Sequence, residues 1–342
     1  MLEFTNSFEP HSLCRSGFAQ TILGSRFPGR TVLPPRKQHK LKIGPRVSLL
    51  VFELPSINTE SPVVLMAHGM GGCSESGYMR RIAGKLVERG FSVFMMNHRG
   101  SGPGMGLSDT LWNGGSSEDI EKVVQYIIQL HPCRPILLVG FSLSGNVLLK
   151  YLGEGRDIPS NVAGAFAVNP PVDLRVASEI LSRNSAVTGI FNGYYMKMIH
   201  RQREALAECF PDALHPPENM KTIWEFDVAY TAPAAGYKDV EEYYKTCSAN
   251  QYLRMIRTPT ILLCAKDDPF VPPEVFDRLR MSLSVYFYAP DAGGHLGYLC
   301  QEPTPLGDRR WMDFQIVDWV HQFAGKGIQF PEAFFGKDPL SF

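Results

Sequence analysis

A chain of 342 residues is longer than a typical single domain, but α/β folds with insertions often reach this length. Apolar residues make up 44% of it, enough for a large core, and 34 basic side chains balance 34 acidic ones. This balance gives no reason to expect nucleic acid or an anionic membrane surface as a partner. The first 20 residues hold no continuous apolar run, and no window reaches about 18 uninterrupted apolar residues. We therefore expect neither a signal peptide nor a membrane span.

Seven cysteines are scattered along the chain, and no two of them form a C-x-x-C pair. An odd number without paired spacing argues against a disulfide framework and against a zinc ribbon, and it fits a reducing compartment. No ligand cluster has the spacing of a metal site, and no G-x-G-x-x-G motif opens a nucleotide-binding unit. We expect a cytoplasmic monomer or small homo-oligomer with no metal and no organic cofactor.

Apolar runs alternate with segments of helical spacing along most of the chain. The apolar runs predict strands at 47–54, 63–67, 91–96, 135–139, 162–168, 260–264 and 285–289, and the continuous apolar character at 63–67 predicts a buried strand. Helices are predicted at 78–89, 117–130, 146–152, 273–283 and 309–323. This alternation indicates an α/β fold with a mostly parallel central sheet and helices on both faces.

The alternation stops after the strand at 162–168, in sequence that is partly helical and rich in Tyr, Phe, Met and Trp. We predict that a helical cap is inserted there. Before the first strand, Pro, Arg, Lys and Gly are frequent, which predicts an irregular arm whose basic cluster at 36–40 is a solvated loop. The predicted parts are an N-terminal arm (1–45), the first part of the core (46–169), the cap (170–257), the second part of the core (258–325) and an irregular C-terminal tail (326–342).

The stretch GFSLSG at 140–145 lies between an apolar run and a run of helical spacing. Strand, tight turn and helix are the setting that a nucleophilic serine needs. The turn lifts the hydroxyl above the end of the sheet, and the helix points its N-terminus at the site. We therefore predict that Ser142 is an acyl-transfer nucleophile. Ser74 lies in the same Gly-x-Ser-x-Ser-Gly skeleton but not directly between a strand and a helix, which makes it the weaker candidate.

Two later strand ends carry the partners that a nucleophilic serine requires. His295 follows the strand at 285–289, and Asp268 follows the strand at 260–264. A histidine takes the serine proton near neutral pH, and a fixed carboxylate sets its tautomer and stabilises its charge. Asp267 is an alternative to Asp268, which we prefer because Asp-Pro-Phe-Val-Pro fits the usual loop after the penultimate strand. The order Ser, Asp, His is that of α/β-hydrolases.

An oxyanion hole needs two backbone N–H groups near the nucleophile. One is predicted at Leu143, directly after Ser142, and the other at Met70, in the glycine-rich turn after the strand at 63–67. His68, at the start of that turn, is expected to hold the oxyanion loop in place. Arg99 and its neighbours are expected to brace a loop, with binding of a substrate carboxylate by Arg99 as the alternative.

These residues carry a family likeness. The chain resembles the YheT-like α/β-hydrolases, a group that includes the animal abhydrolase-domain proteins and plant embryogenesis-associated hydrolases. The matching stretches are 20–22 (QTI), 68–72 (HGMGG), 97–100 (NHRG), 140–143 (GFSL), 225–227 (EFD), 243–244 (YY), 265–270 (AKDDPF) and 293–297 (GGHLG). The resemblance implies an α/β-hydrolase fold with a helical cap. It also implies a Ser-Asp-His triad at Ser142, Asp268 and His295 that acts on carboxylic or lipid esters.

The tight turn around Ser142, which we call the elbow, departs from this family at Ser144, where glycine is usual. Serine adds only a hydroxymethyl group, so we expect the change to be tolerated. The family's Asp-Gly-Asp turn before the first strands is also absent, which bears on the N-terminal strands and not on the predicted site.

Three functions remain in competition. The leading one is a serine esterase or lipase-like hydrolase that forms an acyl-enzyme, and the aromatic residues of the cap suggest a lipid-like or medium-chain acyl ester as its small-molecule substrate. The second is a thioesterase or acyltransferase with the same triad. The third is a non-catalytic binding protein on a hydrolase scaffold, against which the intact triad argues.

Overall fold

The structure is a computed structural model that describes residues 7–29, 31–183 and 186–326. Its centre is an eight-stranded sheet with the strand order β1-β2-β4-β3-β5-β6-β7-β8. The strands are β1 (Lys37–Lys42), β2 (Ser48–Leu54), β3 (Val63–Ala67), β4 (Ser92–Asn97), β5 (Ile136–Phe141), β6 (Val162–Val168), β7 (Thr260–Leu263) and β8 (Val285–Tyr288). The pairs β1–β2 and β2–β4 are antiparallel and the remaining pairs are parallel. Parallel strands buried on both faces explain the continuous apolar runs.

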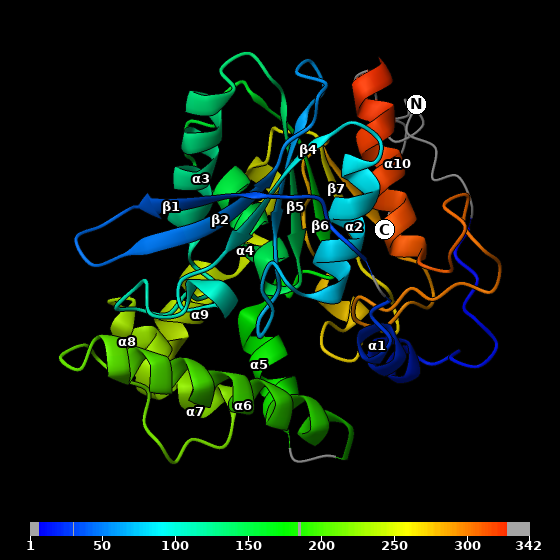
Figure 1. Cartoon of the computed structure of the whole chain (residues 1–342). Helices are drawn as coiled ribbons and strands as arrows, with labels where there is room; N and C mark the ends of the chain where they lie inside the picture. The colour runs from blue at the N-terminus through cyan, green and yellow to red at the C-terminus, as the bar shows by residue number, and fades with distance from the viewer. Residues whose placement is uncertain (1–6, 30, 184–185, 327–342) are drawn as a thin grey trace.

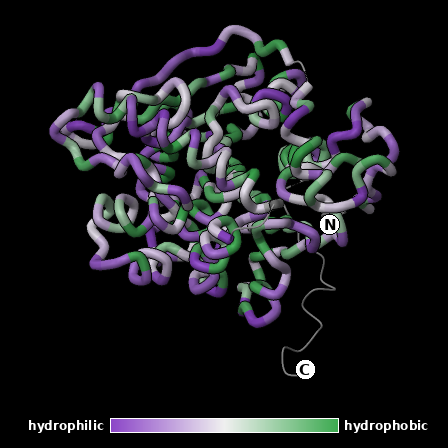
Figure 2. The backbone as a smooth tube through the Cα atoms, turned by 90° about the horizontal axis from the view of Figure 1, so that it is seen from below, coloured by the Kyte–Doolittle hydropathy of each residue, from purple (hydrophilic) through white to green (hydrophobic). Residues whose placement is uncertain are grey.

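Helices cover both faces of the sheet (Figure 1). On one face, α2 (Gly77–Val87) and α10 (Trp311–Lys326) pack together and share a hydrophobic core with the sheet. On the other face, α3 (Ser117–Leu130) and α4 (Leu143–Gly153) form a second core. Seen from below, the hydrophilic segments lie mostly at the periphery and the apolar ones nearer the centre (Figure 2). None of the helices in the described part of the chain combines the length and the apolar character that a bilayer span requires.

Only helical elements occur in the described residues between β6 and β7, and Figure 1 shows α5–α9 gathered below the sheet. They are α5 (Leu174–Ser182), α6 (Ala186–Cys209), α7 (Ile223–Phe226), a π-helical turn η2 (Asp227–Thr231), α8 (Ala232–Ala234) and α9 (Val240–Cys247), followed by the 3₁₀ turns η3 (Ala249–Gln251) and η4 (Leu253–Met255). π-helical turns are rare overall, but those that occur often lie at functional sites.

The prediction of an irregular N-terminal arm was wrong. Helix α1 (Gly17–Arg26) begins at Ser16, whose Oγ accepts a hydrogen bond from the N–H of Ala19 at 3.3 Å. The basic cluster is also not a solvated loop, because it contributes to β1, which pairs with β2 at the edge of the sheet. Basic side chains suit an edge strand, since they oppose pairing with another chain.

The predicted helix at 273–283 was also wrong, because only a short 3₁₀ turn, η5 (Pro273–Val275), forms there. Consecutive prolines open the segment, and the backbone bonds that follow, from Phe276 to Pro273 and from Leu279 to Phe276, connect residues three apart. Such bonds make turns of the 3₁₀ type rather than an α-helix. A further 3₁₀ turn, η1 (Gly102–Gly104), follows β4. The predicted C-terminal tail lies outside the described residues, apart from its first position.

Candidate active site

The turn between β5 and α4 holds Ser142 in a strained backbone conformation. Its φ is +52° and its ψ is −124°, a region that residues other than glycine rarely adopt. The turn is tight enough that a Cβ on Gly140 would lie 2.6 Å from the carbonyl oxygen of Ser144. This is the geometry of a nucleophile elbow, in which the strain presents the serine hydroxyl at the end of the sheet.

The structure brings Ser142, Asp268 and His295 together from three strand ends. The Oγ of Ser142 lies 2.8 Å from Nε2 of His295, and Nδ1 of the same ring lies 2.8 Å from Oδ2 of Asp268. All three side chains are largely buried. Since an ionised carboxylate only accepts hydrogen bonds, Nδ1 carries the proton and Nε2 is free to accept the serine proton. The arrangement fits a nucleophile, a base and an orienting carboxylate.

Asp268, and not Asp267, faces the histidine. Its Oδ1 accepts hydrogen bonds from the N–H groups of Phe270 at 2.8 Å and Val271 at 3.2 Å, which orient the carboxylate. Asn169, at the end of β6, donates its side-chain amide to Oδ2 at 2.6 Å. Oδ1 of Asp267 instead accepts a hydrogen bond from the N–H of Gly294 at 2.8 Å, in the loop that carries His295 (the histidine loop).

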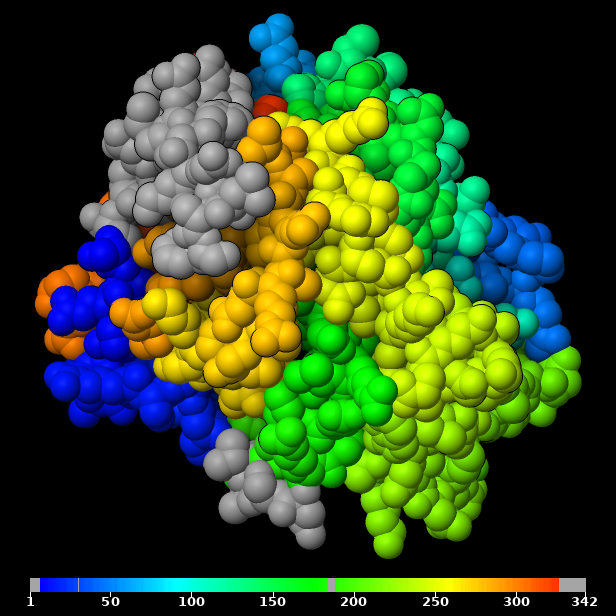
Figure 3. Space-filling model, turned by 180° about the vertical axis from the view of Figure 1, so that it is seen from behind, coloured from blue at the N-terminus to red at the C-terminus, as the bar shows by residue number. Residues whose placement is uncertain are grey.

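Helix α1 braces the loop that carries His295. The N–H of His295 donates to Oγ1 of Thr21 at 2.8 Å. The side chain of Gln20 makes hydrogen bonds with both backbone groups of Leu299, at 2.7 and 3.0 Å. From behind, the N-terminal segment lies beside the orange segments that precede α10 (Figure 3). Helix α1 therefore helps to fix the imidazole, a role that the sequence analysis missed.

The two predicted oxyanion donors lie beside Ser142. A Cβ on Gly69 would be 2.9 Å from Cβ of Ser142, so the turn that carries Met70 approaches the nucleophile as closely as glycine allows. The N–H of Gly69 donates to the hydroxyl of Tyr78 at 3.0 Å, which fixes this turn. Among the described residues, no hydrogen-bond acceptor is found for the N–H groups of Met70 and Leu143. Both donors thus remain available to a ligand.

Ser144 ties the elbow to the oxyanion turn. Its hydroxyl donates to the carbonyl oxygen of His68 and lies 2.6 Å from Nε2 of His98. Because the single hydroxyl proton goes to the carbonyl, Nε2 of His98 must be the donor in the second bond. Burial lowers the pKa of His68 to about 4 and holds the pKa of His98 well below its usual range, so both rings are neutral. His68 acts here as a structural residue, whose Nε2 accepts the N–H of His98 at 3.2 Å.

Replacing Ser144 with alanine should destabilise the fold, because it leaves two buried polar groups without their partner. We expect the free energy of unfolding to fall by about 1–3 kcal/mol in urea titrations. The matched control is Ser25→Ala, which removes an exposed hydroxyl whose hydrogen bond goes to the carbonyl oxygen of Ile22. A Ser144→Ala variant as stable as the Ser25→Ala variant would contradict this role.

Two other predicted candidates lie apart from the triad. Arg99 forms an ion pair with the buried carboxylate of Asp119, with Nε 2.8 Å from Oδ2, so it braces its loop as expected. Ser74 is fully buried, and its Oγ has no hydrogen-bond partner among the described residues, so no histidine accepts its proton there. In the same described part of the chain, no group of three or more His, Cys, Asp or Glu side chains is arranged to hold a metal ion.

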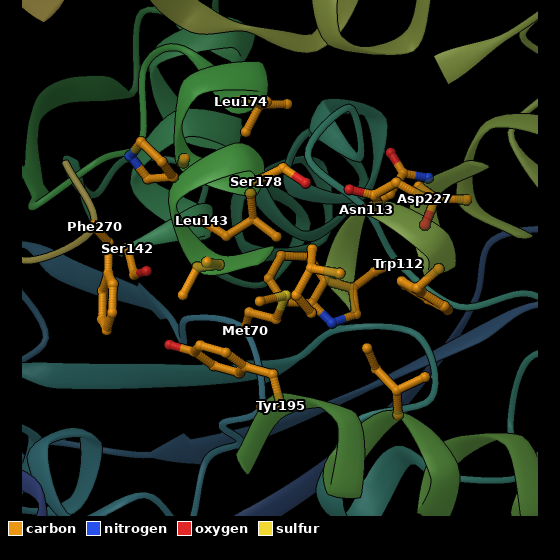
Figure 4. A pocket seen from close by; sticks show the side chains of 18 of the residues that line it. Met70, Trp112, Asn113, Ser142, Leu143, Leu174, Ser178, Tyr195, Asp227 and Phe270 are labelled. Carbon is orange, nitrogen blue, oxygen red and sulfur yellow. The ribbon is translucent and has the colours of Figure 1, made fainter. Parts of the chain in front are cut away.

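Two cavities meet at the candidate triad. The narrow one, of about 80 Å³, runs past Leu143 to residues of α5, α6, α7, η2 and α9 (Figure 4). The wide one, of about 760 Å³, extends along α1, the histidine loop and the first part of α6. The residues that line both cavities are Met70, Ser142, Tyr195, Phe270 and His295. Phe270 had no predicted role at the site. Tyr195 was only one of many cap aromatics expected to line a pocket, because one tyrosine in an aromatic-rich segment gives no signal of its position.

The comparisons with known proteins agree with this architecture. The family model for the alpha/beta hydrolase fold matches residues 62–300. YheT of Escherichia coli is 28% identical over 308 residues, which cover 88% of this chain and 89% of that protein. A monoacylglycerol lipase of Saccharomyces cerevisiae is 28% identical over 75% of this chain and 59% of its own length. The phospholipase ABHD3 of Mus musculus is 28% identical over 86% of this chain and 74% of its own length.

Solved structures share the fold at low sequence identity. The 2,6-dihydroxy-pseudo-oxynicotine hydrolase superposes with a TM-score of 0.58 and 18% identity, over 86% of this chain and 70% of that one. The Pyrococcus furiosus esterase Pf2001 gives a TM-score of 0.54 and 16% identity, over 86% of this chain and 99% of that one. The sheet order, the elbow and the family match lead to one conclusion: this chain is a member of the α/β-hydrolase family, with YheT among its relatives.

Proposed function

We propose that the protein is a serine hydrolase that cleaves carboxylic esters through an acyl-enzyme on Ser142. The observation that carries this proposal is the continuous hydrogen-bonded chain from Ser142 through His295 to Asp268, with 2.8 Å at each step. The names of the relatives, which include a monoacylglycerol lipase and a phospholipase, support an ester as the substrate class.

In the proposed mechanism, the Oγ of Ser142 attacks the ester carbonyl while Nε2 of His295 takes its proton. Asp268 keeps the imidazole oriented and stabilises the imidazolium that forms. The N–H groups of Met70 and Leu143 bind the oxyanion, whose charge develops only on the way to the tetrahedral intermediate. His295 then protonates the departing alcohol, and a water molecule activated by the same ring releases the acid.

The two cavities suggest how the ester lies. The leaving oxygen must reach Nε2 of His295, so the alcohol departs on the side of the histidine loop, where the wide cavity is lined by Leu296. The acyl chain then enters the narrow cavity beyond Leu143, whose lining includes Leu174, Ala177 and Ile199. In this proposal the helices α5–α9 form a cap that encloses a medium-length acyl chain.

This placement of the acyl chain predicts a preference for longer acyl groups. For 4-nitrophenyl esters from acetate to octanoate, kcat/KM should rise about fourfold for each methylene group that the narrow cavity buries. A faster reaction with acetate than with octanoate would contradict the proposal.

A matched variant tests the same cavity. Ala177→Leu, in α5, should reduce activity on octanoate and spare activity on acetate, because the larger side chain shortens the cavity. An equal loss for both esters would place the acyl chain elsewhere.

A second candidate function is acyl transfer to an alcohol. The wide cavity offers room for an acceptor other than water, and a yeast relative named medium-chain fatty acid ethyl ester synthase/esterase 2 is 29% identical over 77% of this chain and 62% of its own length. Adding ethanol to the octanoate reaction and measuring the ratio of ethyl ester to free acid distinguishes transfer from hydrolysis.

A further inference from the structure

A buried carboxyl group lies in the lining of the narrow cavity. Asp227 is the first residue of the π-helical turn η2, its side chain is only 8% exposed, and it lines the same cavity as Ser142. In the close-up, Asp227 and Ser142 lie at opposite sides of the view, with Leu143 between them (Figure 4). A substrate chain that starts at Ser142 and fills this cavity therefore approaches the carboxyl group of Asp227.

The charge of Asp227 is poorly compensated. Its Oδ2 accepts the hydroxyl of Tyr244 at 2.8 Å, and that hydroxyl in turn contacts Oγ of Ser178 at 2.8 Å. Within the described ranges, no Lys, Arg or His side chain forms an ion pair with Asp227. Burial accordingly raises the pKa of Asp227 to about 6, so the group is mostly ionised at neutral pH without a cation beside it. A buried carboxylate in this state gains from any additional hydrogen-bond donor.

Two neighbouring hydroxyl groups have unused hydrogen-bonding capacity. Thr231, at the other end of η2, lies beside Asp227, and its hydroxyl lowers the pKa of that carboxyl, although the contact falls outside the geometry of an ordinary hydrogen bond. The hydroxyl of Tyr243 accepts the N–H of Gly114 at 3.0 Å, and no acceptor for its own proton is found in the described part of the chain. Both residues line the narrow cavity. Its lining thus combines a carboxylate acceptor, one hydroxyl without an acceptor for its proton among the described residues, at Tyr243, and a second hydroxyl, at Thr231, that can still accept.

A purely apolar chain long enough to reach Asp227 is a poor match for the polar part of this lining, although it suits the apolar part nearer Ser142. It would displace solvent from the carboxylate of Asp227 and offer no hydrogen bond in return. A hydroxyl group matches it, because one oxygen donates to the carboxylate or to Thr231 and accepts from Tyr243. An ammonium group would satisfy the carboxylate but would accept nothing from the hydroxyl of Tyr243.

We propose that Asp227 and Thr231 form a subsite that binds a hydroxyl group carried on the acyl chain of the ester substrate. This inference rests on the proposed function, since it places the acyl chain in the narrow cavity. It specifies the substrate class further: the preferred ester carries a hydroxylated acyl group. Asp227 determines specificity here and takes no part in the bond-breaking steps.

The test compares 4-nitrophenyl esters of ω-hydroxy acids with the unsubstituted esters of the same length, from four to twelve carbons. At the length whose hydroxyl reaches Asp227, the wild-type kcat/KM should favour the hydroxy ester by about tenfold or more, the size expected for a hydrogen bond to a charged group. At shorter lengths the ratio should lie near or below one. A ratio at or below one at every length overturns the subsite.

Variants assign the preference to its residues. Asp227→Leu should abolish the preference for the hydroxy ester, and Thr231→Val should reduce it severalfold. Thr231→Val keeps the size and branching of the side chain, so it tests the same subsite with a smaller change to the fold. The control is Asp212→Asn, an exposed carboxyl that pairs with Arg46 outside both cavities, and it should keep the wild-type ratio. A wild-type ratio in both Asp227→Leu and Thr231→Val contradicts the assignment.

Two further measurements distinguish the subsite from its alternatives and from the proposed hydrolase activity. Esters of ω-amino acids of the same lengths should react more slowly than the hydroxy esters, and a faster reaction would overturn the assignment of a hydroxyl in favour of an ammonium group. Titration of Ser142 with a fluorophosphonate reports on the proposed function independently of the subsite. Labelling without a hydroxyl preference refutes the subsite alone, whereas absence of labelling refutes the proposed hydrolase.

Discussion

Replacing Ser142 with alanine should lower kcat for 4-nitrophenyl octanoate by about 10⁶-fold, because the acyl-enzyme cannot form without Oγ and the remaining triad residues cannot act alone. Initial-rate measurements on purified protein check this result, and thermal unfolding verifies that the variant is folded. The variant should keep the strained backbone at φ +52°, because alanine carries a Cβ as serine does.

Ser74→Ala is the matched control for this substitution. The two serines occupy the same sequence skeleton, but Ser74 is buried and forms no hydrogen bond through its Oγ in the described residues. Its variant should hydrolyse the ester at a rate close to that of the wild type. A Ser142→Ala variant that keeps more than about one hundredth of the wild-type rate would contradict the assignment of the nucleophile.

The second large effect is expected at the triad carboxylate. Asp268→Asn should lower kcat by about 10⁴-fold, because an amide beside Nδ1 of His295 favours the wrong tautomer and does not stabilise an imidazolium. Asp267→Asn should cost less than about tenfold, since the amide oxygen still accepts the N–H of Gly294. Equal losses in the two variants would contradict the assignment of separate roles to these adjacent residues.

The elbow and its partners were predictable because their positions follow from chain topology. Carboxyl ends of neighbouring parallel strands share one edge of a sheet, so residues that follow β5, β7 and β8 meet there. Ser142, Asp268 and His295 each follow such an end, and the structure places them in contact. Mostly apolar runs likewise marked β2–β8, of which β8, at the edge of the sheet, is only half-buried.

Other features could not be predicted because the residues that they bury are not apolar. The buried positions of α1 are Gly17, Gln20, Thr21 and Gly24, which form no hydrophobic stripe, so nothing in the spacing indicated a helix. Its contact with the histidine loop joins residues that are 274 positions apart in the chain. Asn169 offered only the weak signal of a polar residue after a strand.

Ser144 shows how the structure changes the interpretation of a sequence departure. In sequence it is a tolerated replacement for a small glycine at the elbow. In the structure its hydroxyl forms hydrogen bonds with the carbonyl oxygen of His68 and with Nε2 of His98. These bonds connect α4 to the turn that carries Met70. The departure therefore comes with its own hydrogen bonds, and the close packing at the elbow is provided by Gly140.

The most direct test of the central claim is to label the protein with a fluorophosphonate and to locate the adduct by mass spectrometry. Such probes react with a serine only when a neighbouring base activates it. We predict one adduct, on Ser142, that disappears in the Ser142→Ala variant and is nearly lost in Asp268→Asn. Absence of labelling, or an adduct on Ser74 or another serine, would contradict the account.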